Sequence, residues 1–269
     1  MGPVETRPLA VVTGASSGIG RELAARFAEA GFDLVVAAED ERIGSAARSF
    51  AEHAIKAVPV QADLATFDGI EALCWAIRAT GRAPEALAIN AGVGVAGDFA
   101  RDNDLADELR LINLNITGAV HLAKRVLPGM ITAGRGGVLF TSSIAATAPG
   151  PYHATYAASK AFLLSFAEAL RHELRDTGVT VTALLPGPTD TEFFDRAGMQ
   201  GTKLREQTAK DDPAKVAREG FDALMAGKDH VIAGSMKNKV QAAAGRVLPE
   251  TAKAKVQAQQ TEPGSGQQS

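Results

Sequence analysis

Tyr156 and Lys160 lie four residues apart, and Ser143 precedes the tyrosine by thirteen residues. In a helix, residues four apart share a face, so the lysine ammonium would lie one turn from the phenol. A nearby ammonium lowers the phenol pKa from its usual value of about 10. A phenol tuned in this way can exchange a proton with an alcohol or carbonyl oxygen, which Ser143 could also hydrogen-bond. Because this spacing is common in solvated helices, the rest of the chain must supply the context.

A glycine-rich loop near the N-terminus lies between an expected strand and an expected helix. Residues 9–13 form an apolar, β-branched run, and a helical pattern follows at 21–30. Gly14 permits a tight turn, Gly18 lets the backbone approach a pyrophosphate, and Gly20 allows close packing of helix and strand. This context predicts a dinucleotide phosphate site at the helix N-terminus. The alternative is an ordinary glycine-rich turn of an α/β protein.

Strand and helix patterns alternate along the chain. Strands are expected at residues 9–13, 34–38, 57–61, 87–90, 138–141, 179–185 and 230–233. Helices are expected at 21–30, 43–53, 69–80, 105–127, 156–177 and 213–226, with Pro128 bending or ending the fourth. The alternation predicts a single doubly wound Rossmann-type α/β domain, with a mostly parallel seven-stranded sheet flanked by helices on both faces. Gly14, Asn90, Ser143 and Pro186 each follow a strand, so they should meet at the carboxyl edge, where such sheets bind ligands.

The chain divides by composition into a nucleotide-binding domain and an extension. We expect the domain to cover residues 1–235, and a basic, partly helical extension to cover 236–269, with a disordered tail from residue 262. Apolar residues recur in the extension at roughly helical spacing, at Val240, Ala244, Val247 and Leu248. The extension could cover the core edge, cross to another subunit, or lie loosely on the surface.

The composition is that of an ordinary globular protein. The 269 residues are 46% apolar and 22% charged, and the net charge of -3 gives no electrostatic case for a nucleic acid or membrane partner. The single cysteine, Cys74, excludes an internal disulfide and suits a reducing compartment. Residues 1–8 lack a secretory pattern, so a cytoplasmic location is expected. The five histidines are scattered, and no metal site is expected.

Over residues 10–233 the chain resembles the short-chain dehydrogenase/reductase family. The motifs that carry the resemblance occur in the family's order: residues 13–20, Asp63-Leu64, Asn90-Ala91-Gly92, Asn115, Ser143, Tyr156 with Lys160, and residues 186–191. The resemblance implies an NAD(P)-dependent oxidoreductase that interconverts a secondary alcohol and a carbonyl, with Tyr156 as general acid and base. It also implies a homodimer or homotetramer formed through the long helices.

The resemblance assigns a role to each motif. The implied catalytic residues are Asn115, Ser143, Tyr156 and Lys160, with Asn115 holding a water that links Lys160 to solvent. Ser142 is the neighbouring candidate, but the thirteen-residue spacing favours Ser143. Lys160 would also bind the nicotinamide ribose. The implied cofactor-binding residues are Gly14, Ser16, Ser17, Gly18, Ile19, Gly20, Glu39, Asp63, Leu64, Asn90, Ala91, Gly92, Tyr156, Lys160, Pro186, Gly187, Thr189 and Thr191.

The residues after the second strand bear on the choice of cofactor. A carboxylate there binds both ribose hydroxyls and repels a 2′-phosphate, whereas an arginine attracts it. Ala38 occupies the position where NAD-dependent relatives usually carry aspartate, but Glu39, Asp40 and Glu41 follow directly. Arg42 is the nearby positive charge. The acidic run predicts that NAD(H) is preferred over NADP(H), with NADP(H) as the alternative.

The segment 192–211 is polar, with the large apolar residues Phe193, Phe194 and Met199. It is interpreted as a mobile substrate lid, with a disordered surface loop as the alternative. A moderately apolar substrate pocket is expected from Gly94, Val95, Ile144, Ala145, Tyr152, Phe193 and Phe194. His153 and His172 are expected to be surface or structural residues.

Two other functions share parts of this pattern. A dinucleotide-binding sensor or scaffold would keep the fold without turnover, and a Rossmann-like methyltransferase would keep the glycine loop. Neither needs the tyrosine–lysine pair, which therefore favours an oxidoreductase acting on a small-molecule alcohol or carbonyl.

Overall fold

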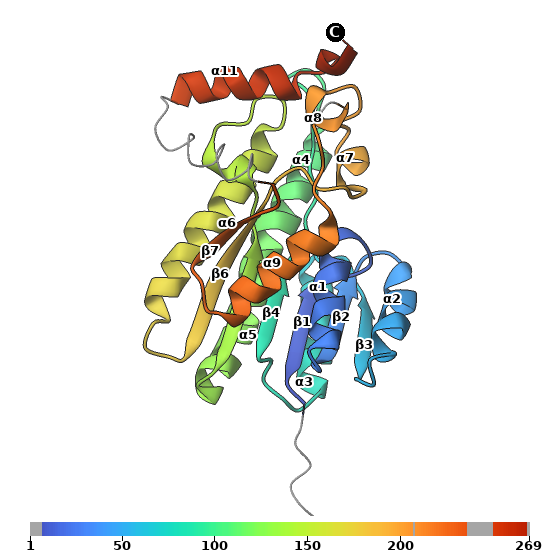
Figure 1. Ribbon diagram of the computed structural model, residues 1–269, viewed down its shortest axis with the longest axis vertical. Coiled ribbons are helices and arrows are strands. Elements are labelled where there is room, and N and C mark those ends of the chain that lie inside the picture. The colour runs from blue at the N-terminus through green and yellow to red at the C-terminus, as the bar shows by residue number, and fades with distance from the viewer. Residues whose placement is uncertain (1–6, 207, 236–249, 268–269) are drawn as a thin grey trace, which may run out of the picture.

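A seven-stranded parallel sheet forms the centre of the molecule (Figure 1). The computed structural model describes residues 7–206, 208–235 and 250–267. The strands are β1 Leu9–Thr13, β2 Asp33–Ala38, β3 Ala57–Gln61, β4 Ala86–Ile89, β5 Gly136–Thr141, β6 Val179–Pro186 and β7 His230–Ala233. Their order, β3-β2-β1-β4-β5-β6-β7, confirms the predicted Rossmann-type architecture. The order reverses at β1 and β4, so their carboxyl ends mark the expected ligand site.

Helices cover both faces of the sheet. They are α1 Gly18–Glu29, α2 Arg42–Ala51, α3 Phe67–Ala79, α4 Leu105–Ile112, α5 Ala119–Ala133, α6 Ala154–Glu173, α7 Phe193–Arg196, α8 Lys203–Glu206, α9 Pro213–Met225 and α11 Glu250–Thr261. Buried residues of α1, α2 and α9 form one core with the sheet, and those of α3, α5 and α6 form a second core on its other face. No helix in the described ranges combines the length and apolar character that crossing a membrane requires.

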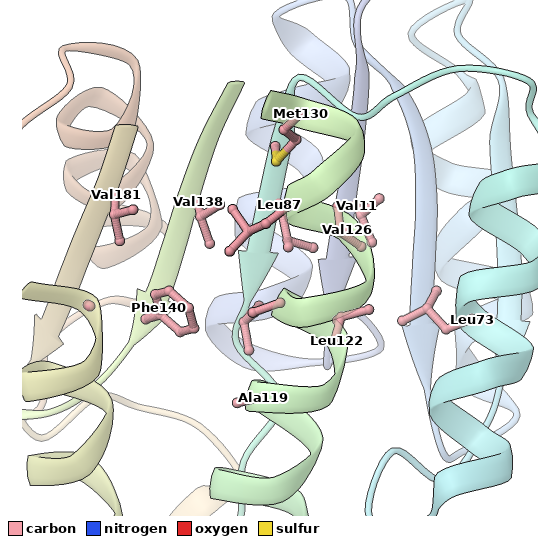
Figure 2. Close-up of a cluster of buried hydrophobic side chains, with 14 of the residues drawn as sticks. Val11, Leu73, Leu87, Ala119, Leu122, Val126, Met130, Val138, Phe140 and Val181 are labelled. Atoms are coloured by element: carbon pink, nitrogen blue, oxygen red, sulfur yellow. The ribbon is translucent and has the colours of Figure 1, made fainter. Parts of the chain in front are cut away.

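The two cores follow from the alternation of side chains along buried strands. Val11 and Val12 of β1 are both fully buried, but they belong to opposite cores, because successive strand residues point to opposite faces. Figure 2 shows Leu122, Val126 and Met130 of α5 lying against the strands on one of these faces. Each fully buried side chain of this size contributes about 1.5–3 kcal/mol. The sheet therefore forms a fixed base for the loops at its carboxyl edge.

The helix predicted at 105–127 is not continuous. A π-helical segment, Asn113–Gly118, separates α4 from α5. A Cβ at Gly118 would lie 2.5 Å from the Leu64 carbonyl oxygen, so the chain passes very close to the loop after β3. Such π-helical turns often occur at functional sites, and this one contains Asn115.

Pro128 does not end its helix, which was one of the two expected outcomes. Pro128 lies inside α5, which continues to Ala133 and ends at Gly134 with a φ of 66°. Pro128 and Lys124, whose carbonyl loses its helical partner, are both exposed, so water can solvate the unpaired oxygen. The buried residues Val126 and Met130 on either side hold the helix against the sheet. Tertiary packing therefore outweighs the local effect of the proline.

The C-terminal residues are ordered where the structure describes them. Residues 262–267 were expected to be disordered, but they form a turn and a short 3-10 helix, Ser265–Gln267. This segment is bonded to the start of α8, where the Lys203 amide donates to Ser265 Oγ at 3.1 Å. The apolar residues noted at helical spacing, Val240, Ala244, Val247 and Leu248, lie outside the described residues. The expected domain boundary falls between residue 235, which is described, and residue 236, which is not.

The core predicts a clear difference between buried and exposed phenylalanines. Phe140 on β5 is fully buried, so Phe140→Ala should lower the free energy of unfolding by about 3–5 kcal/mol, because it leaves a cavity between β5 and α6. Phe99 is 61% exposed, and Phe99→Ala should change it by less than about 0.5 kcal/mol. Urea unfolding followed by circular dichroism measures both. Equal effects of the two substitutions would contradict this description of the core.

Candidate active site

The loop between β1 and α1 lies at the carboxyl edge of the sheet. Gly14 has a φ of +68°, a left-handed conformation that glycine adopts without strain, and its amide donates to the Ala37 carbonyl at 2.8 Å. A Cβ at Gly20 would lie 2.2 Å from the Gly14 carbonyl oxygen, so a glycine is required there. Because α1 begins at Gly18, its free amide groups and positive dipole end lie at this loop. The loop therefore offers donors to an anionic group.

Asn90, just after β4, joins three strands through its hydrogen bonds. Its side-chain amide donates to the Thr13 carbonyl at 3.1 Å, and its backbone amide donates to Thr13 Oγ1 at 2.9 Å. Thr141 Oγ1, at the end of β5, donates to Asn90 Oδ1 at 3.1 Å. The Thr141 carbonyl in turn accepts a hydrogen bond from Lys160 Nζ at 2.9 Å. One continuous chain of hydrogen bonds thus runs from β1 through β4 and β5 to α6.

Ser143, Tyr156 and Lys160 all line one cleft at this edge. Lys160 is only 4% exposed, and its Nζ lies 5.7 Å from the centre of the Tyr156 ring. Ser143 hydrogen-bonds Tyr156, whereas Ser142 donates to the Lys160 carbonyl at 2.7 Å. Ser142 is therefore tied to the backbone of α6, and Ser143 is the hydroxyl beside the phenol. The spacing argument from the sequence selects the same serine.

Burial dominates the protonation of the tyrosine and the lysine. Burial raises the pKa of Tyr156 to about 12, and the hydrogen bond with Ser143 offsets only part of this increase. Burial also lowers the pKa of Lys160 to about 8. The expected net lowering of the phenol pKa is wrong for this structure, because the loss of hydration dominates and the net shift is upward. At neutral pH the phenol is protonated and Lys160 is mostly charged.

Asn115 lies beneath the cleft rather than on its wall. It is 1% exposed, and its side chain accepts from the Val93 amide at 3.0 Å and donates to the Val93 carbonyl at 2.9 Å. It also donates to Ser159 Oγ, one residue before Lys160, at 3.0 Å. Among the predicted catalytic residues, Asn115 is the one that does not line the cleft. Asn115 lies in the π-helical segment, and its side-chain amide joins the loop after β4 to α6.

The end of the cleft near β2 and β3 is lined by carboxylates that arginines hold in place. Arg110 Nη2 binds Glu39 at 2.8 Å, and Arg110 Nη1 binds Asp63 at 2.9 Å. Ser16 Oγ donates to Asp40 at 2.7 Å, which ties the glycine loop to the segment after β2. Nothing in the sequence signalled Arg110, which lies 47 residues from Asp63. Its contacts nevertheless fix two of the predicted cofactor-binding carboxylates.

Arg42 forms an ion pair with Glu192, which lines the cleft. The two nitrogens of the Arg42 fork lie 2.8 and 3.1 Å from the Glu192 oxygens, and Arg42 Nε binds Asp40 at 3.0 Å. Glu192 also pairs with Arg196. The pair joins the start of α2 to the start of α7, which are 150 residues apart in the chain.

The segment 192–211, expected to be a lid or a disordered loop, carries its own small core. Phe194, Ala197 and Met199 are buried together and contact Phe193 and Leu204. The Phe193 ring lies 5.1 Å from the Tyr156 ring. The disordered alternative is therefore wrong for the described residues, and the segment covers the tyrosine.

Thr189 and Thr191 connect β6 to this segment. The Thr189 hydroxyl donates to the Gly187 carbonyl at 2.9 Å, and the Thr191 hydroxyl accepts from the Phe193 amide at 3.3 Å. Thr191 thus bonds the first residue of α7, whose N-cap residue is Glu192. Both residues line the cleft.

The cleft has a volume of about 680 Å³, within the range of ligand sites. Every residue predicted to bind a cofactor lines it: Gly14, Ser16, Ser17, Gly18, Ile19, Gly20, Glu39, Asp63, Leu64, Asn90, Ala91, Gly92, Tyr156, Lys160, Pro186, Gly187, Thr189 and Thr191. Of the expected pocket residues, Gly94, Ile144, Ala145, Phe193 and Phe194 also line it.

Two expected pocket residues, Val95 and Tyr152, are not part of the cleft wall. Tyr152 has a φ of +62°, unusual for a bulky residue, and its hydroxyl donates to Glu262 at 3.4 Å. Its side chain therefore contacts the C-terminal segment rather than the cleft.

Sequence reasoning missed several residues of the wall. His153 was treated as a surface or structural residue, but it lines the cleft and is 4% exposed. Burial lowers its pKa to about 4, so it is neutral at physiological pH. Gln257 and Gln260 of α11 also line the cleft, and no local pattern linked them to residues a hundred positions earlier. Only the three-dimensional path of the chain brings them there.

The wall suits an elongated nicotinamide dinucleotide. The glycine loop offers amide donors at one point of the cleft, and Tyr156 and Lys160 lie at another. A Cβ at Gly92 would lie 3.2 Å from Lys160 Nζ and 3.1 Å from Asn115 Oδ1, so glycine leaves this stretch of the wall open. The residues present therefore fit such a cofactor.

The buried lysine predicts a pH dependence of stability. Its folded pKa of about 8 is below the ordinary 10.5, so carrying the charge in the folded state costs free energy below about pH 8. This cost disappears as the pH rises toward 10.5. The free energy of unfolding of the wild type, relative to Lys160→Met, should therefore rise by about 2 kcal/mol between pH 7 and 9.5. Urea unfolding of both proteins measures this difference, and a constant or falling difference would contradict it.

Comparisons with known proteins agree with this geometry. The family model for short chain dehydrogenase matches residues 8–200. The chain is 35% identical over 187 residues to sulfoacetaldehyde reductase 2 of Chromohalobacter salexigens, covering 69% of this chain and 74% of that one.

Solved structures share the fold. A short-chain dehydrogenase from Sphingobium yanoikuyae in complex with NADPH has a TM-score of 0.77 and 31% identity, with 84% of this chain and 87% of that chain covered. The bulky-bulky ketone specific alcohol dehydrogenase of Comamonas testosteroni has a TM-score of 0.75 and 27% identity, with 89% and 92% covered. A family match over most of the chain, a fold that agrees with it and a cleft lined by the family's motifs lead to one conclusion: the chain belongs to the short-chain dehydrogenase family of oxidoreductases.

Proposed function

We propose that this protein interconverts a secondary alcohol and a carbonyl with a nicotinamide dinucleotide, using Tyr156 as general acid and base. The observation that carries the proposal is that Ser143, Tyr156 and Lys160 line the same cleft as the glycine loop. This arrangement permits a dinucleotide and a substrate to bind next to each other. When bound, the nicotinamide would supply hydride exchange with the substrate carbon.

Tyr156 provides the proton in the direction of carbonyl reduction. With a pKa of about 12, its phenol is protonated at neutral pH and can donate to the carbonyl oxygen as charge develops there. Ser143, hydrogen-bonded to the phenol, can hold the same oxygen. In alcohol oxidation the proton returns from the alcohol to the phenolate.

Lys160 stabilises the phenolate that forms when the proton leaves. Its ammonium is anchored by the Thr141 carbonyl and lies 5.7 Å from the phenol ring centre, in surroundings from which water is largely excluded. In such surroundings an opposite charge acts more strongly than in water. Lys160 would also bind the nicotinamide ribose, as the family resemblance implies.

Asn115 acts as a positioning residue in this proposal. Its amide holds both the loop after β4 and Ser159, next to Lys160. Because these bonds occupy the side chain, they support a role in fixing the position of Lys160. They give less direct support to the water-holding role expected from the family.

We propose that NAD(H) is preferred over NADP(H). Glu39 and Asp40 line the cleft after β2, where they would repel a 2′-phosphate. Arg42, the cation that could compensate, is already bound to Asp40 and to both oxygens of Glu192. The NADPH bound to the Sphingobium yanoikuyae relative shows that the other choice occurs in this family.

Self-association through the long helices remains a proposal. Leu105 and Leu109 on α4 are 70% and 48% exposed, and Phe162 on α6 is 37% exposed. Exposed apolar residues on these helices support a homodimer or homotetramer that would cover them.

Replacement of the phenol tests the proposed chemistry. Tyr156→Phe should lower kcat for ketone reduction by a factor of about 10²–10⁴, because it removes the proton donor, while the Kd for the cofactor stays within about threefold. Tyr152→Phe changes the only other tyrosine in the chain and should leave kcat near that of the wild type. Stopped-flow absorbance of NADH and fluorescence titration give the two quantities.

Two results would overturn this mechanism. The first is full activity of Tyr156→Phe. The second is cofactor binding without turnover of any alcohol or carbonyl in a broad panel, which would instead favour the sensor function.

Cofactor preference can be measured by binding. The Kd for NADPH should exceed that for NADH by at least about fivefold, because two carboxylates repel the 2′-phosphate. Glu39→Gln combined with Asp40→Asn should narrow this ratio. Glu41→Gln, an exposed acidic neighbour that does not line the cleft, should leave the ratio unchanged. Tighter NADPH binding by the wild type would reverse the proposed preference.

A further inference from the structure

The C-terminal helix α11 lies across the carboxyl end of the molecule, on the side of α6 and away from α2 and β3 (Figure 1). The sequence left open whether this extension covers the core, reaches another subunit or lies loosely on the surface. In the structure it is bonded to its own chain beside the cleft. Its position therefore bears on the substrate rather than on the adenine end of the cofactor.

Three hydrogen bonds fix α11 and the turn after it. Thr261 Oγ1 donates to the Pro151 carbonyl at 2.8 Å, and Pro151 lies five residues before Tyr156. The Lys203 amide donates to Ser265 Oγ at 3.1 Å, and the Gly266 amide donates to the Gly201 carbonyl at 2.9 Å. Thr261 and Ser265 are 1% and 6% exposed, so these contacts are protected from water. They join α11 to the loop that leads into the catalytic helix and to the start of α8.

Gln257 and Gln260 line the cleft from this helix. They are three residues apart, so they lie on one face of α11, and both are partly buried. Gln259, between them, is exposed. The part of the lid that lines the same cleft is largely apolar, formed by Phe193, Phe194, Met199 and Leu204. The described part of α11 therefore adds two amide groups to a cleft whose lid portion is largely apolar, and a few polar groups in an apolar pocket are what usually define orientation and specificity.

We propose that Gln257 and Gln260 select the substrate by hydrogen-bonding an uncharged polar group on it, remote from the reacting carbonyl. A carboxamide carries both a donor and an acceptor and no charge, which suits a hydroxyl or a carbonyl oxygen better than an anion. Arg196, a cation in the described part of the cleft wall, is already paired with Glu192. The substrate class is therefore a ketone, or the matching alcohol, with an apolar body and a distal neutral hydrogen-bonding group. This inference rests on the proposed oxidoreductase function.

Three ketones on one skeleton test the inference. They are 4-phenyl-2-butanone, 4-(4-hydroxyphenyl)-2-butanone and 4-(3-oxobutyl)benzoate, which carry no distal group, a neutral hydroxyl and an anion. The wild type should show a kcat/KM for the hydroxyl ketone at least about tenfold above that for the other two, because the phenyl ketone makes no such hydrogen bond and the benzoate brings an unpaired charge into the cleft. The difference should lie mainly in KM, since the contacts are remote from the proton transfer.

The variants Gln257→Ala and Gln260→Ala, alone and combined, should remove this preference. In the double variant the kcat/KM ratio of the hydroxyl ketone to the phenyl ketone should approach one, with the rate on the phenyl ketone nearly unchanged. Gln259→Ala is the matched control, because it removes the same side chain from the exposed face of the same helix. The melting temperature and the Kd for NADH should match the wild type in all variants, which excludes a folding defect.

The outcomes separate the inference from the function beneath it. If ketone reduction depends on Tyr156 but the ratio is the same in wild type and double variant, the inference is wrong and the proposed function stands. Preference for the phenyl ketone or for the benzoate in the wild type also overturns the inference. If no ketone in a broad panel is reduced with NADH or NADPH, the proposed function and the inference fail together.

Discussion

The hydrogen-bond chain from Thr13 through Asn90 and Thr141 to Lys160 is the constraint on which the rest of the cleft depends. It crosses β1, β4 and β5 at the point where the strand order reverses, and it ends on the ammonium of α6. Each bond joins segments at least nineteen residues apart, so the chain forms only when the sheet is assembled. A shift of any one of these strands would break at least one bond of this chain. The fold and the candidate chemistry are therefore fixed by the same contacts.

Burial of the tyrosine–lysine pair costs free energy that packing alone does not explain. Each group alone is held in its less favourable surroundings, since burial raises the pKa of Tyr156 and lowers that of Lys160. Apolar residues of similar size would satisfy the packing without this cost. Perturbed groups that share a cleft are typical of active sites. The pair would become favourable together when the phenol gives up its proton beside the charged lysine.

The sequence was informative where the structure depends on local patterns. Apolar runs located all seven strands, and the glycines from Gly14 to Gly20 located the start of the cleft, because strand burial and helix starts have short-range signatures. The thirteen-residue spacing favours Ser143, which is the serine that lies beside the phenol, whereas Ser142 bonds the Lys160 carbonyl. Since parallel strands bring their carboxyl ends to one edge, residues that follow strands could be placed together without knowing any contact.

Features that depend on distant contacts could not be predicted. Arg110 binds carboxylates that follow two different strands, and Gln257 reaches the cleft from the far end of the chain. Pro128 is tolerated only because its neighbours are buried against the sheet. The predicted direction of the Tyr156 pKa shift was also wrong, because the shift depends on how completely the folded chain excludes water from the phenol. The spacing of residues along the sequence does not indicate any of these properties.

The Arg42–Glu192 pair has a consequence for how the protein responds to salt. Both side chains are about half exposed, at 44% and 51%, so dissolved ions can screen their attraction. The bond between Lys160 and the Thr141 carbonyl is buried and is not screened in this way. Concentrated salt would therefore weaken the contact between α2 and α7 while leaving the buried lysine in place.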